Sequence, residues 1–232
     1  MVIFIVLFCL VISLNADPLI IPVYQDGIVD HVVPSDPVWN FRSSVRLGYD
    51  SYQSRSYRGW LKFDLDFLPT DREMFGVEIC FILSLRKHEY LDIYDIANID
   101  QVSEEASVWN NQPTMGALLV ENVSLNPQQQ VGDNWLVSFS STAMDNSIKA
   151  AIDNSQHYWG CVLKEIISGY SGYAFLSTRE SLDVQAPYMK IYFCDDNEYD
   201  INTDCEIDLF DLMLLAENWL GCGYSQEVLC QF

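Results

Sequence analysis

Apolar and polar residues alternate in many short segments along most of the chain. In residues 57–65, apolar side chains and a glycine occupy every second position, and Arg58, Trp60 and Lys62 lie between them. A period of two places the two sets on opposite faces of a β-strand. Similar patterns predict further strands at residues 45–49, 79–85, 91–96, 118–123, 135–139, 161–166, 173–176 and 189–193.

The order of these segments indicates the fold class. Many short strands without a strand–helix–strand rhythm are typical of a β-sandwich or jelly roll. One helix is predicted at about residues 142–154, where Ser140 or Ser141 can cap its first turn. A second helix is predicted at residues 209–220, ending at Gly221. We therefore expect a mainly β fold, a β-sandwich or jelly roll with one short helix, followed by a small α-helical calcium-loop tail.

The chain begins with an apolar run, residues 1–14, that turns polar at Asn15. This run is too short for a membrane-spanning helix, which needs about 20 residues. Its length fits the core of a signal peptide cleaved after Ala16, and a buried N-terminal strand is the alternative. We expect an exported protein without a membrane span, either secreted or held at the cell surface.

Charge divides the mature chain into two parts. The protein has 33 acidic and 12 basic residues, a formal net charge of −21, and half of its residues are hydrophobic. Such an apolar fraction indicates a packed core, and the excess of negative charge argues against a nucleic-acid partner. Residues 194–232 carry ten of the acids and no base. We therefore expect a β domain at residues 17–193 and a separate tail at residues 194–232.

Six cysteines follow the expected signal peptide, and four of them lie in the tail. An even number of cysteines in an exported chain favours disulfides. The pairing cannot be read from the sequence. The cysteines are Cys80, Cys161, Cys194, Cys205, Cys222 and Cys230.

Four motifs of the β domain occur in a fixed order. They are RGWLKFDLDFLP at 58–69, SVWNNQP at 107–113, FLSTRES at 175–181 and PYMKIYF at 187–193. In order and spacing they resemble the DNRLRE-domain family over residues 23–193. The resemblance implies a non-catalytic jelly-roll module of secreted proteins, related to carbohydrate-binding modules and often attached to polysaccharide-active proteins. Some relatives bind acidic algal glycans.

Basic residues gather around the first motif, and with one aromatic residue they form a candidate ligand patch. Its members are Arg42, Arg46, Arg58, Trp60 and Lys62. Arginine matches carboxylates well, and an exposed aromatic ring can stack on a sugar. We therefore expect a surface for polysaccharide, with an anionic, uronate-type glycan as one candidate. The alternative is that the bases pair with local acids and Trp60 packs under a loop.

Catalytic residues are less evident. The three histidines accompany no serine or cysteine in a recognisable nucleophile motif. A glycosidase-type carboxylate pair depends on a separation in space that a sequence does not give. In the FLSTRES motif, we expect Ser177, Arg179 and Glu180 to form a structural hydrogen-bond cluster. A non-catalytic module is therefore favoured, with a polysaccharide-degrading enzyme or a structural surface or matrix protein as alternatives.

The tail contains the spacing of a calcium-binding loop. Positions 1, 3, 5, 7, 9 and 12 are Asp200, Asn202, Asp204, Glu206, Asp208 and Asp211. Ca²⁺ takes roughly six to eight oxygen ligands, and this spacing can wrap them around one ion, with Glu206 giving its backbone carbonyl. Cys205 departs from the glycine usual at position 6. The alternative is an acidic capped helix whose charges are solvated.

Residues 200–220 resemble a single dockerin repeat, with Asp211 at position 12. Dockerins attach enzymes or modules to cohesin partners and usually carry two such repeats, whereas one is visible here. The resemblance implies a calcium-stabilised tail for attachment or assembly, with a cohesin-like or cell-surface protein as its partner.

Overall fold

The computed structural model describes the β domain and one helix of the tail. The described residues are 18–30, 44–50, 55–69, 72–85, 90–108, 110–125, 129–131, 134–166, 172–180, 185–194 and 209–222. The predicted signal peptide and residues 200–208, which hold five of the six predicted calcium ligands, lie outside these ranges. No helix within the described ranges combines the length and the apolar character needed to cross a membrane.

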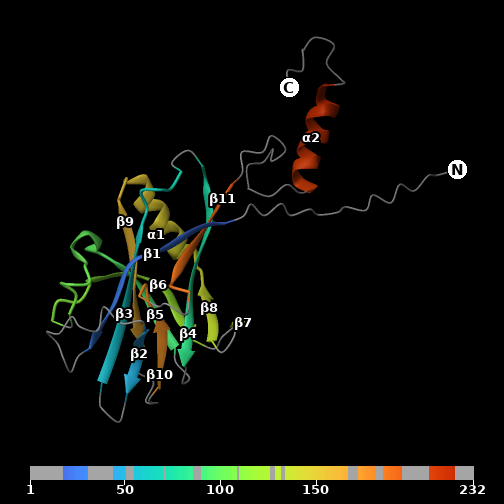
Figure 1. Ribbon diagram of the computed structural model, residues 1–232. Coiled ribbons are helices and arrows are strands. Elements are labelled where there is room, and N and C mark those ends of the chain that lie inside the picture. The colour runs from blue at the N-terminus through green and yellow to red at the C-terminus, as the bar shows by residue number, and fades with distance from the viewer. Residues whose placement is uncertain are drawn as a thin grey trace.

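Strands make up most of the described secondary structure, so the prediction of a mainly β fold is confirmed (Figure 1). The strands are β1 (Leu19–Asp30), β2 (Ser44–Asp50), β3 (Arg55–Asp64), β4 (Met74–Leu85), β5 (Tyr90–Ile96), β6 (Met115–Ser124), β7 (Gln129–Val131), β8 (Asn134–Phe139), β9 (Tyr158–Glu165), β10 (Gly172–Ser177) and β11 (Tyr188–Phe193). The helices are η2 (Ile99–Gln101), α1 (Thr142–Asp153) and α2 (Leu209–Cys222).

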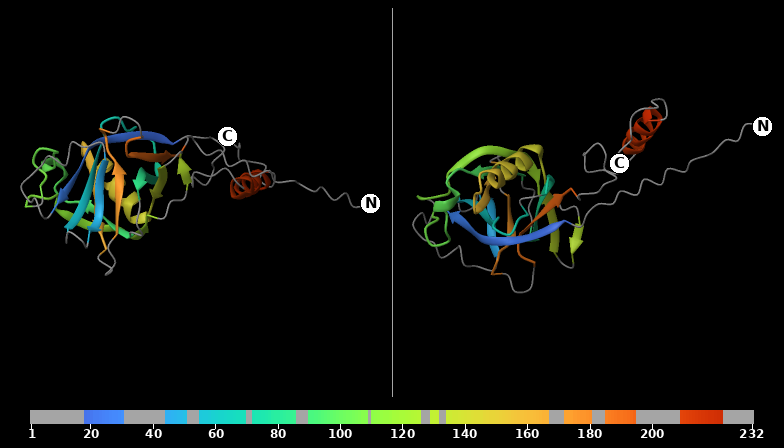
Figure 2. Two further views of the ribbon diagram at one scale, coloured as in Figure 1. Left: turned by 60° about the horizontal axis from the view of Figure 1, so that its bottom comes forward. Right: turned by 90° about the horizontal axis from the view of Figure 1, so that it is seen from above.

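The strands form one antiparallel sheet that curls until it closes on itself (Figure 2). Strand β1 pairs with β11 through its first residues and with β3 through the rest. Strand β4 likewise pairs with β11 and then with β10, which continues through β2 to β3. Six strands therefore make a closed ring, which β9, β5 and β6 extend from β3, and β8 and β7 extend from β4.

Strand β1 was not predicted, although it closes the ring by pairing with both β11 and β3. Its register shifts between Val23 and Gln25, where the strand changes partners. After the shift, Ile28 packs into the main core and Val29 is buried too, so burial no longer alternates. A strand buried on both faces lacks the period of two on which the other predictions rest.

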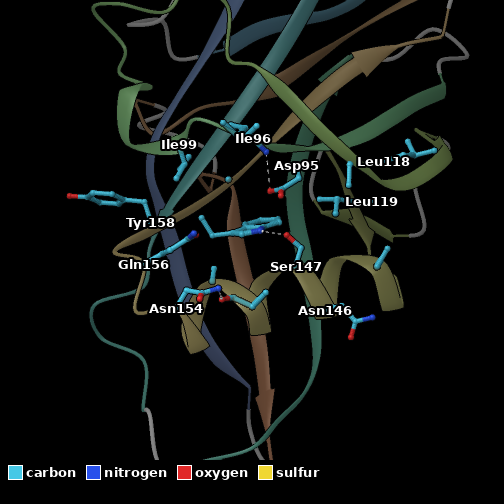
Figure 3. A pocket seen from close by; sticks show the side chains of 17 residues that line it. Asp95, Ile96, Ile99, Leu118, Leu119, Asn146, Ser147, Asn154, Gln156 and Tyr158 are labelled. Atoms are coloured by element: carbon cyan, nitrogen blue, oxygen red, sulfur yellow. Dashed lines mark hydrogen bonds between the residues drawn. The ribbon is translucent and has the colours of Figure 1, made fainter.

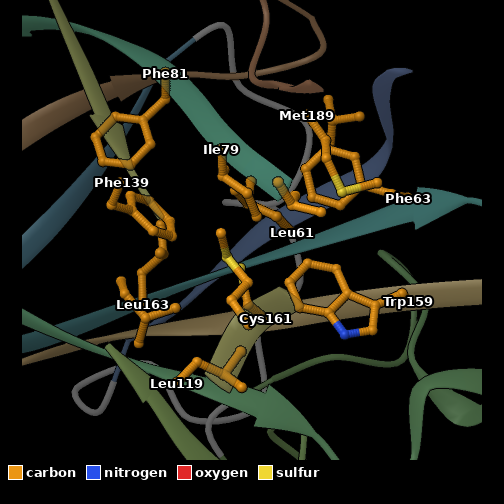
Figure 4. Close-up of a cluster of buried hydrophobic side chains, with 14 of the residues drawn as sticks. Leu61, Phe63, Ile79, Phe81, Leu119, Phe139, Trp159, Cys161, Leu163 and Met189 are labelled. Atoms are coloured by element: carbon orange, nitrogen blue, oxygen red, sulfur yellow. The ribbon is translucent and has the colours of Figure 1, made fainter. Parts of the chain in front are cut away.

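The inward faces of the strands enclose the main hydrophobic core (Figure 4). Leu61 and Phe63 of β3 are fully buried there, as their alternation predicts. Phe81 and Phe139 meet edge to face, with ring centroids 5.9 Å apart. Such aromatic pairs stabilise a core beyond the area they bury.

Helix α1 lies against the sheet and matches its prediction. The Ser141 hydroxyl caps the helix by accepting a hydrogen bond from the Met144 N–H at 3.1 Å. The same hydroxyl donates to the Leu119 carbonyl at 2.6 Å, which ties the start of the helix to β6. Met144 and Ile148 face the core and are fully buried, so one side of α1 is anchored.

The described cysteines fall into two kinds. Cys80 and Cys161 are free thiols, buried on β4 and β9. The expectation of disulfides is therefore wrong for these two cysteines. Cys194, directly after β11, is disulfide-bonded, and the side chain of its partner is outside the described set.

Candidate functional site

The predicted ligand patch is covered. Arg58, Trp60 and Lys62 do share the outer face of β3, but Trp60 is 1% exposed and Lys62 4% exposed. The segment between β5 and β6, residues 97–114, lies over them and is called here the β5–β6 loop. The expectation that Trp60 stacks on a sugar is therefore wrong, because its ring packs under a loop.

Each of the three side chains has a structural role under this loop. Trp60 packs with Ile99 and Val102 in a second hydrophobic cluster. The Lys62 ammonium donates to the Val102 carbonyl at 3.0 Å, and burial lowers its pKa. Arg58 donates to Gln112 Oε1 at 2.9 Å. The loop thus supplies hydrogen-bond acceptors to Arg58 and Lys62, two basic groups that sequence reasoning assigned to a ligand.

The other predicted site residues are described only in part. Arg42 lies outside the described residues, and Arg46 is placed by its backbone alone, opposite Phe175 in β2. Of the predicted calcium ligands, only Asp211 is described. It stands in the first turn of α2 and is 3% exposed. The described residues contain no group of three or more His, Cys, Asp or Glu side chains that could hold a metal.

Arg179 and Glu180 of the FLSTRES motif belong to a hydrogen-bonded cluster, as predicted, whereas the Ser177 hydroxyl donates outside it, to the Gln185 carbonyl at 2.9 Å. The Arg179 guanidinium donates to Glu104 Oε2 at 2.9 Å, to Glu180 Oε1 at 3.1 Å and to the Tyr24 carbonyl at 2.8 Å. The Arg179 N–H donates to Asp26 Oδ2 at 2.7 Å. These four charged residues, Asp26, Glu104, Arg179 and Glu180, are called the Arg179 cluster.

The Arg179 cluster contains three acids and one base, and the pKa values of two of the acids are raised. Asp26 and Glu104 are buried on β1 and in the β5–β6 loop. Burial raises the pKa of Asp26 to about 7, against the hydrogen bond from the Arg179 backbone, and the charges of Glu180 and Glu104 raise it further. Burial also raises the pKa of Glu104. The cluster fastens three separate segments of the chain together.

A groove opens on the other side of the β5–β6 loop, between α1 and the strands β5, β6 and β9 (Figure 3). Its volume is about 450 Å³, within the range of small-molecule sites. The helix contributes a row of short side chains from Ala143 to Asn154, which leave the space open. We call this feature the α1 groove.

Two hydrogen bonds lie along the floor of the α1 groove. The Trp159 indole donates to Ser147 Oγ at 2.9 Å, and the Ser147 side chain lies near the Asp95 carboxylate. Asp95 also accepts from the Ile96 N–H at 2.9 Å. Burial raises the pKa of Asp95. Figure 3 shows this row of groups between the helix and the sheet.

The rim of the groove carries polar groups that have no partner among the described residues. Asn146 and Gln156 are exposed and make no side-chain hydrogen bond within the described ranges. Asn154 donates to the Ala150 carbonyl at 2.7 Å, which leaves its Oδ1 open. Leu118, an exposed apolar residue, adds to the wall of the groove.

An aromatic pair stands at the end of the groove. Tyr158 lines the groove and stacks on Tyr24 of β1, with ring centroids 5.2 Å apart and planes inclined by 22°. Tyr24 is 41% exposed. The Lys62 ammonium lies 4.2 Å from the Tyr158 ring centroid and makes a cation–π contact with this ring. Aromatic rings beside amides are the usual components of sugar-binding sites.

Sequence reasoning did not identify the α1 groove. Its walls come from residues 95–99, 117–119 and 143–160, which no local pattern links. The one readable signal was the helical spacing of small residues at Ala143, Ser147 and Ala150. Comparison of the sequence with protein-family models and with curated proteins found no match.

Proposed function

We propose that the protein is an exported, non-catalytic module that binds extracellular polysaccharide in the α1 groove. The observation that carries this proposal is a set of amides around a groove of about 450 Å³ with an aromatic rim: Asn146 and Gln156 have no side-chain hydrogen bond among the described residues, and Asn154 keeps its Oδ1 open. Amides both donate and accept hydrogen bonds, so they suit the hydroxyl groups of a sugar. The apolar wall suits its carbon-bound hydrogens.

We infer that the curled sheet is the jelly roll implied by the DNRLRE resemblance. The antiparallel pairing throughout and the closed ring of six strands support this assignment. Two of the family-like motifs also meet in space, because Arg58 bonds to Gln112, and Arg179 of a third motif bonds to Glu104, three residues before the second motif. Motifs that bond to one another in this way are expected to characterise a fold more than a ligand.

A non-catalytic role fits the described carboxylates better than hydrolysis does. Glycosidases need two carboxyl groups facing a cleft, roughly 5 to 9.5 Å apart. In the Arg179 cluster, Asp26 and Glu104 are buried and bonded to Arg179. Asp95 is the sole carboxylate among the described residues that line the α1 groove.

The tail is proposed to bind Ca²⁺ and to attach the module to a cohesin-like or cell-surface protein. The burial of Asp211 at the first turn of α2 supports a ligand position, because a solvated carboxylate would be exposed. Five large apolar residues of α2 are exposed and offer contact area for such a partner. They are Leu209, Phe210, Leu212, Met213 and Leu215.

A glycan array of the full chain tests the binding function. We expect binding to at least one polysaccharide, and a loss of about thirtyfold on replacing both Asn146 and Gln156 with alanine, since each lost hydrogen bond weakens binding by about 1 kcal/mol. Lys149→Ala, on α1 outside the groove, serves as the control. Absence of binding to every glycan would overturn the proposal.

Calorimetry tests the calcium proposal separately. Adding Ca²⁺ to EDTA-treated protein is expected to release heat and to raise the helix content measured by circular dichroism. Asp211→Ala should weaken Ca²⁺ binding at least tenfold. Glu217→Gln removes an exposed charge from the same helix and should leave the affinity unchanged. Equal affinities in the two variants would contradict the assignment of Asp211.

A further inference from the structure

We propose that the α1 groove selects uncharged sugar units and discriminates against uronates. This inference rests on the proposed binding function and names the ligand class. It departs from the sequence-based expectation of an anionic glycan, which relied on a patch of basic residues. The described basic side chains of that patch, Arg58 and Lys62, lie under the β5–β6 loop and do not line the groove.

The charges at the groove have one sign. Among the described residues that line it, Asp95 is the only ionisable acid, and no lysine, arginine or histidine is present. The nearest bases in the sequence are engaged elsewhere. Lys149 pairs with Glu73 at 3.4 Å, and His157 Nδ1 contacts Asp66 Oδ1 at 2.6 Å. A carboxylate in the groove would therefore meet a like charge and no counter-ion among the described residues that line it, since the Lys62 ammonium beneath the β5–β6 loop is 4% exposed and donates to the Val102 carbonyl.

Desolvation strengthens this discrimination. An ion that leaves water for a partly enclosed site loses hydration, and only a partner of opposite charge compensates for that loss. Two carboxylates that share such a site disfavour each other's ionised form. The Asp95 carboxyl already shows the cost of burial as a raised pKa. A uronate beside Asp95 would need to take up a proton or remain outside.

A neutral sugar in the groove would find hydrogen-bond partners and would not be repelled by Asp95. Its hydroxyl groups can donate to the Asp95 carboxylate and to the free Asn154 Oδ1, while the Asn146 and Gln156 amides can donate to its oxygens. A hydrogen bond to a charged acceptor is stronger than one between neutral groups. The carboxylate that repels a uronate therefore holds a neutral unit in position.

Matched oligosaccharides test this inference in the full chain. The probes are oligogalacturonate and its methyl ester, which share length and stereochemistry, together with neutral oligosaccharides of xylan, glucan, mannan and galactan. In affinity gel electrophoresis and calorimetry at 0.15 M salt, we expect the protein to bind neutral oligosaccharides. Oligogalacturonate should bind at least tenfold more weakly than its methyl ester.

Two variants locate the discrimination at Asp95. Asp95→Asn removes the charge, keeps an oxygen that can accept from the Ile96 N–H, and should reduce the neutral-to-acidic affinity ratio toward one. Glu105→Gln removes one charge from an exposed position of the β5–β6 loop and should preserve the ratio. Asn146→Lys, on the exposed rim, supplies a base and should increase uronate binding even if Asp95→Asn fails to fold.

The outcomes separate the two proposals. Uronate binding equal to or tighter than neutral binding in the unaltered protein would overturn the selectivity and leave the binding function standing. An unchanged affinity ratio in both Asp95→Asn and Asn146→Lys would place the discrimination elsewhere and also overturn the inference. Binding of no probe and no arrayed glycan would overturn the binding function itself.

Discussion

The α1 groove and the Arg179 cluster flank the same loop and contain carboxylates, yet their polar groups differ in what they bond to. In the Arg179 cluster, one guanidinium bonds to two carboxylates and a carbonyl, and its two main acids, Asp26 and Glu104, are buried. In the groove, Asn146 and Gln156 are exposed and bond to no described side chain.

This difference separates groups that hold the fold from groups that can hold a ligand. Polar side chains satisfied inside the protein contribute to stability, and losing one partner leaves a buried charge behind. Polar side chains that are unsatisfied around an open volume cost little to remove and gain a partner on binding. We therefore expect substitutions in the cluster to change stability and substitutions in the groove to change affinity.

The largest expected effect is a dependence of stability on pH that comes from Asp26. Its folded-state pKa of about 7 lies above the ordinary value of 3.8, so the native state holds the proton more tightly than the unfolded chain. This contribution is full below pH 4 and is lost as the pH rises through 7. The slope is about 1.4 kcal/mol per pH unit within that window.

Urea denaturation between pH 4 and pH 8 measures this slope. Asp26→Asn keeps a neutral side chain of the same shape and should flatten the curve relative to the unaltered protein. The charged groups that face Asp26, namely Glu104, Arg179 and Glu180, remain in place. Asp153→Asn, at an exposed position of α1, is the control. Equal slopes for both variants would remove Asp26 as the source.

The next effect is the loss of the Arg179 guanidinium. Arg179→Met keeps much of the apolar stem but leaves Glu104, whose side chain is 3% exposed, without its cation. We expect a loss of about 3 kcal/mol in the free energy of unfolding, reduced somewhat by the partial exposure of Arg179. Lys149→Met breaks the exposed pair with Glu73 and should cost at most about 0.5 kcal/mol. Similar losses in the two variants would abolish the contrast.

The β5–β6 loop explains where sequence reasoning succeeded and where it failed. The alternation in β3 correctly placed Leu61 and Phe63 inside and Trp60 and Lys62 on the opposite face. A period of two states which face a residue occupies, but it contains no information about what covers that face. The loop that buries Trp60 begins 37 residues later, at residue 97, and only the tertiary fold brings the two together.

The same limit applies to the site. The cap of α1 could be predicted because Ser141 and Met144 are neighbours in the sequence. The α1 groove could not be predicted, because Asp95 and Ser147 meet only after β5 and α1 pack around the sheet. Local chemistry is readable from local sequence, and a binding site assembled from distant segments is not.

A smaller effect on stability is expected at Gly160, which lines the α1 groove. A Cβ added at Gly160 of β9 would collide with the Leu61 carbonyl oxygen and lie 2.7 Å from Ile99 Cδ1. We expect Gly160→Ala to lower the free energy of unfolding by about 2 kcal/mol and to displace the β5–β6 loop. Gly76→Ala meets its nearest atom, Tyr192 Cδ2, at 3.8 Å and should be tolerated. Equal stability of both variants, by urea denaturation, would contradict the close packing at Gly160.

The smallest expected effect on stability comes from the rim of the α1 groove. Asn146→Ala and Gln156→Ala remove exposed amides that bond to no described side chain, so each should change the free energy of unfolding by less than about 0.5 kcal/mol. Ser147→Ala lies in the same groove but removes the acceptor of the Trp159 indole N–H, and should cost about 1 kcal/mol.

This internal control sharpens the contrast, because all three positions belong to one helix face or its end and differ mainly in whether the side chain has a partner. A loss above 1 kcal/mol for the amide variants would mean that the rim supports the fold. The groove would then resemble the Arg179 cluster, and its polar groups would be structural. If the amide variants keep the stability of the unaltered protein but bind glycan more weakly, then these amides serve to bind a ligand.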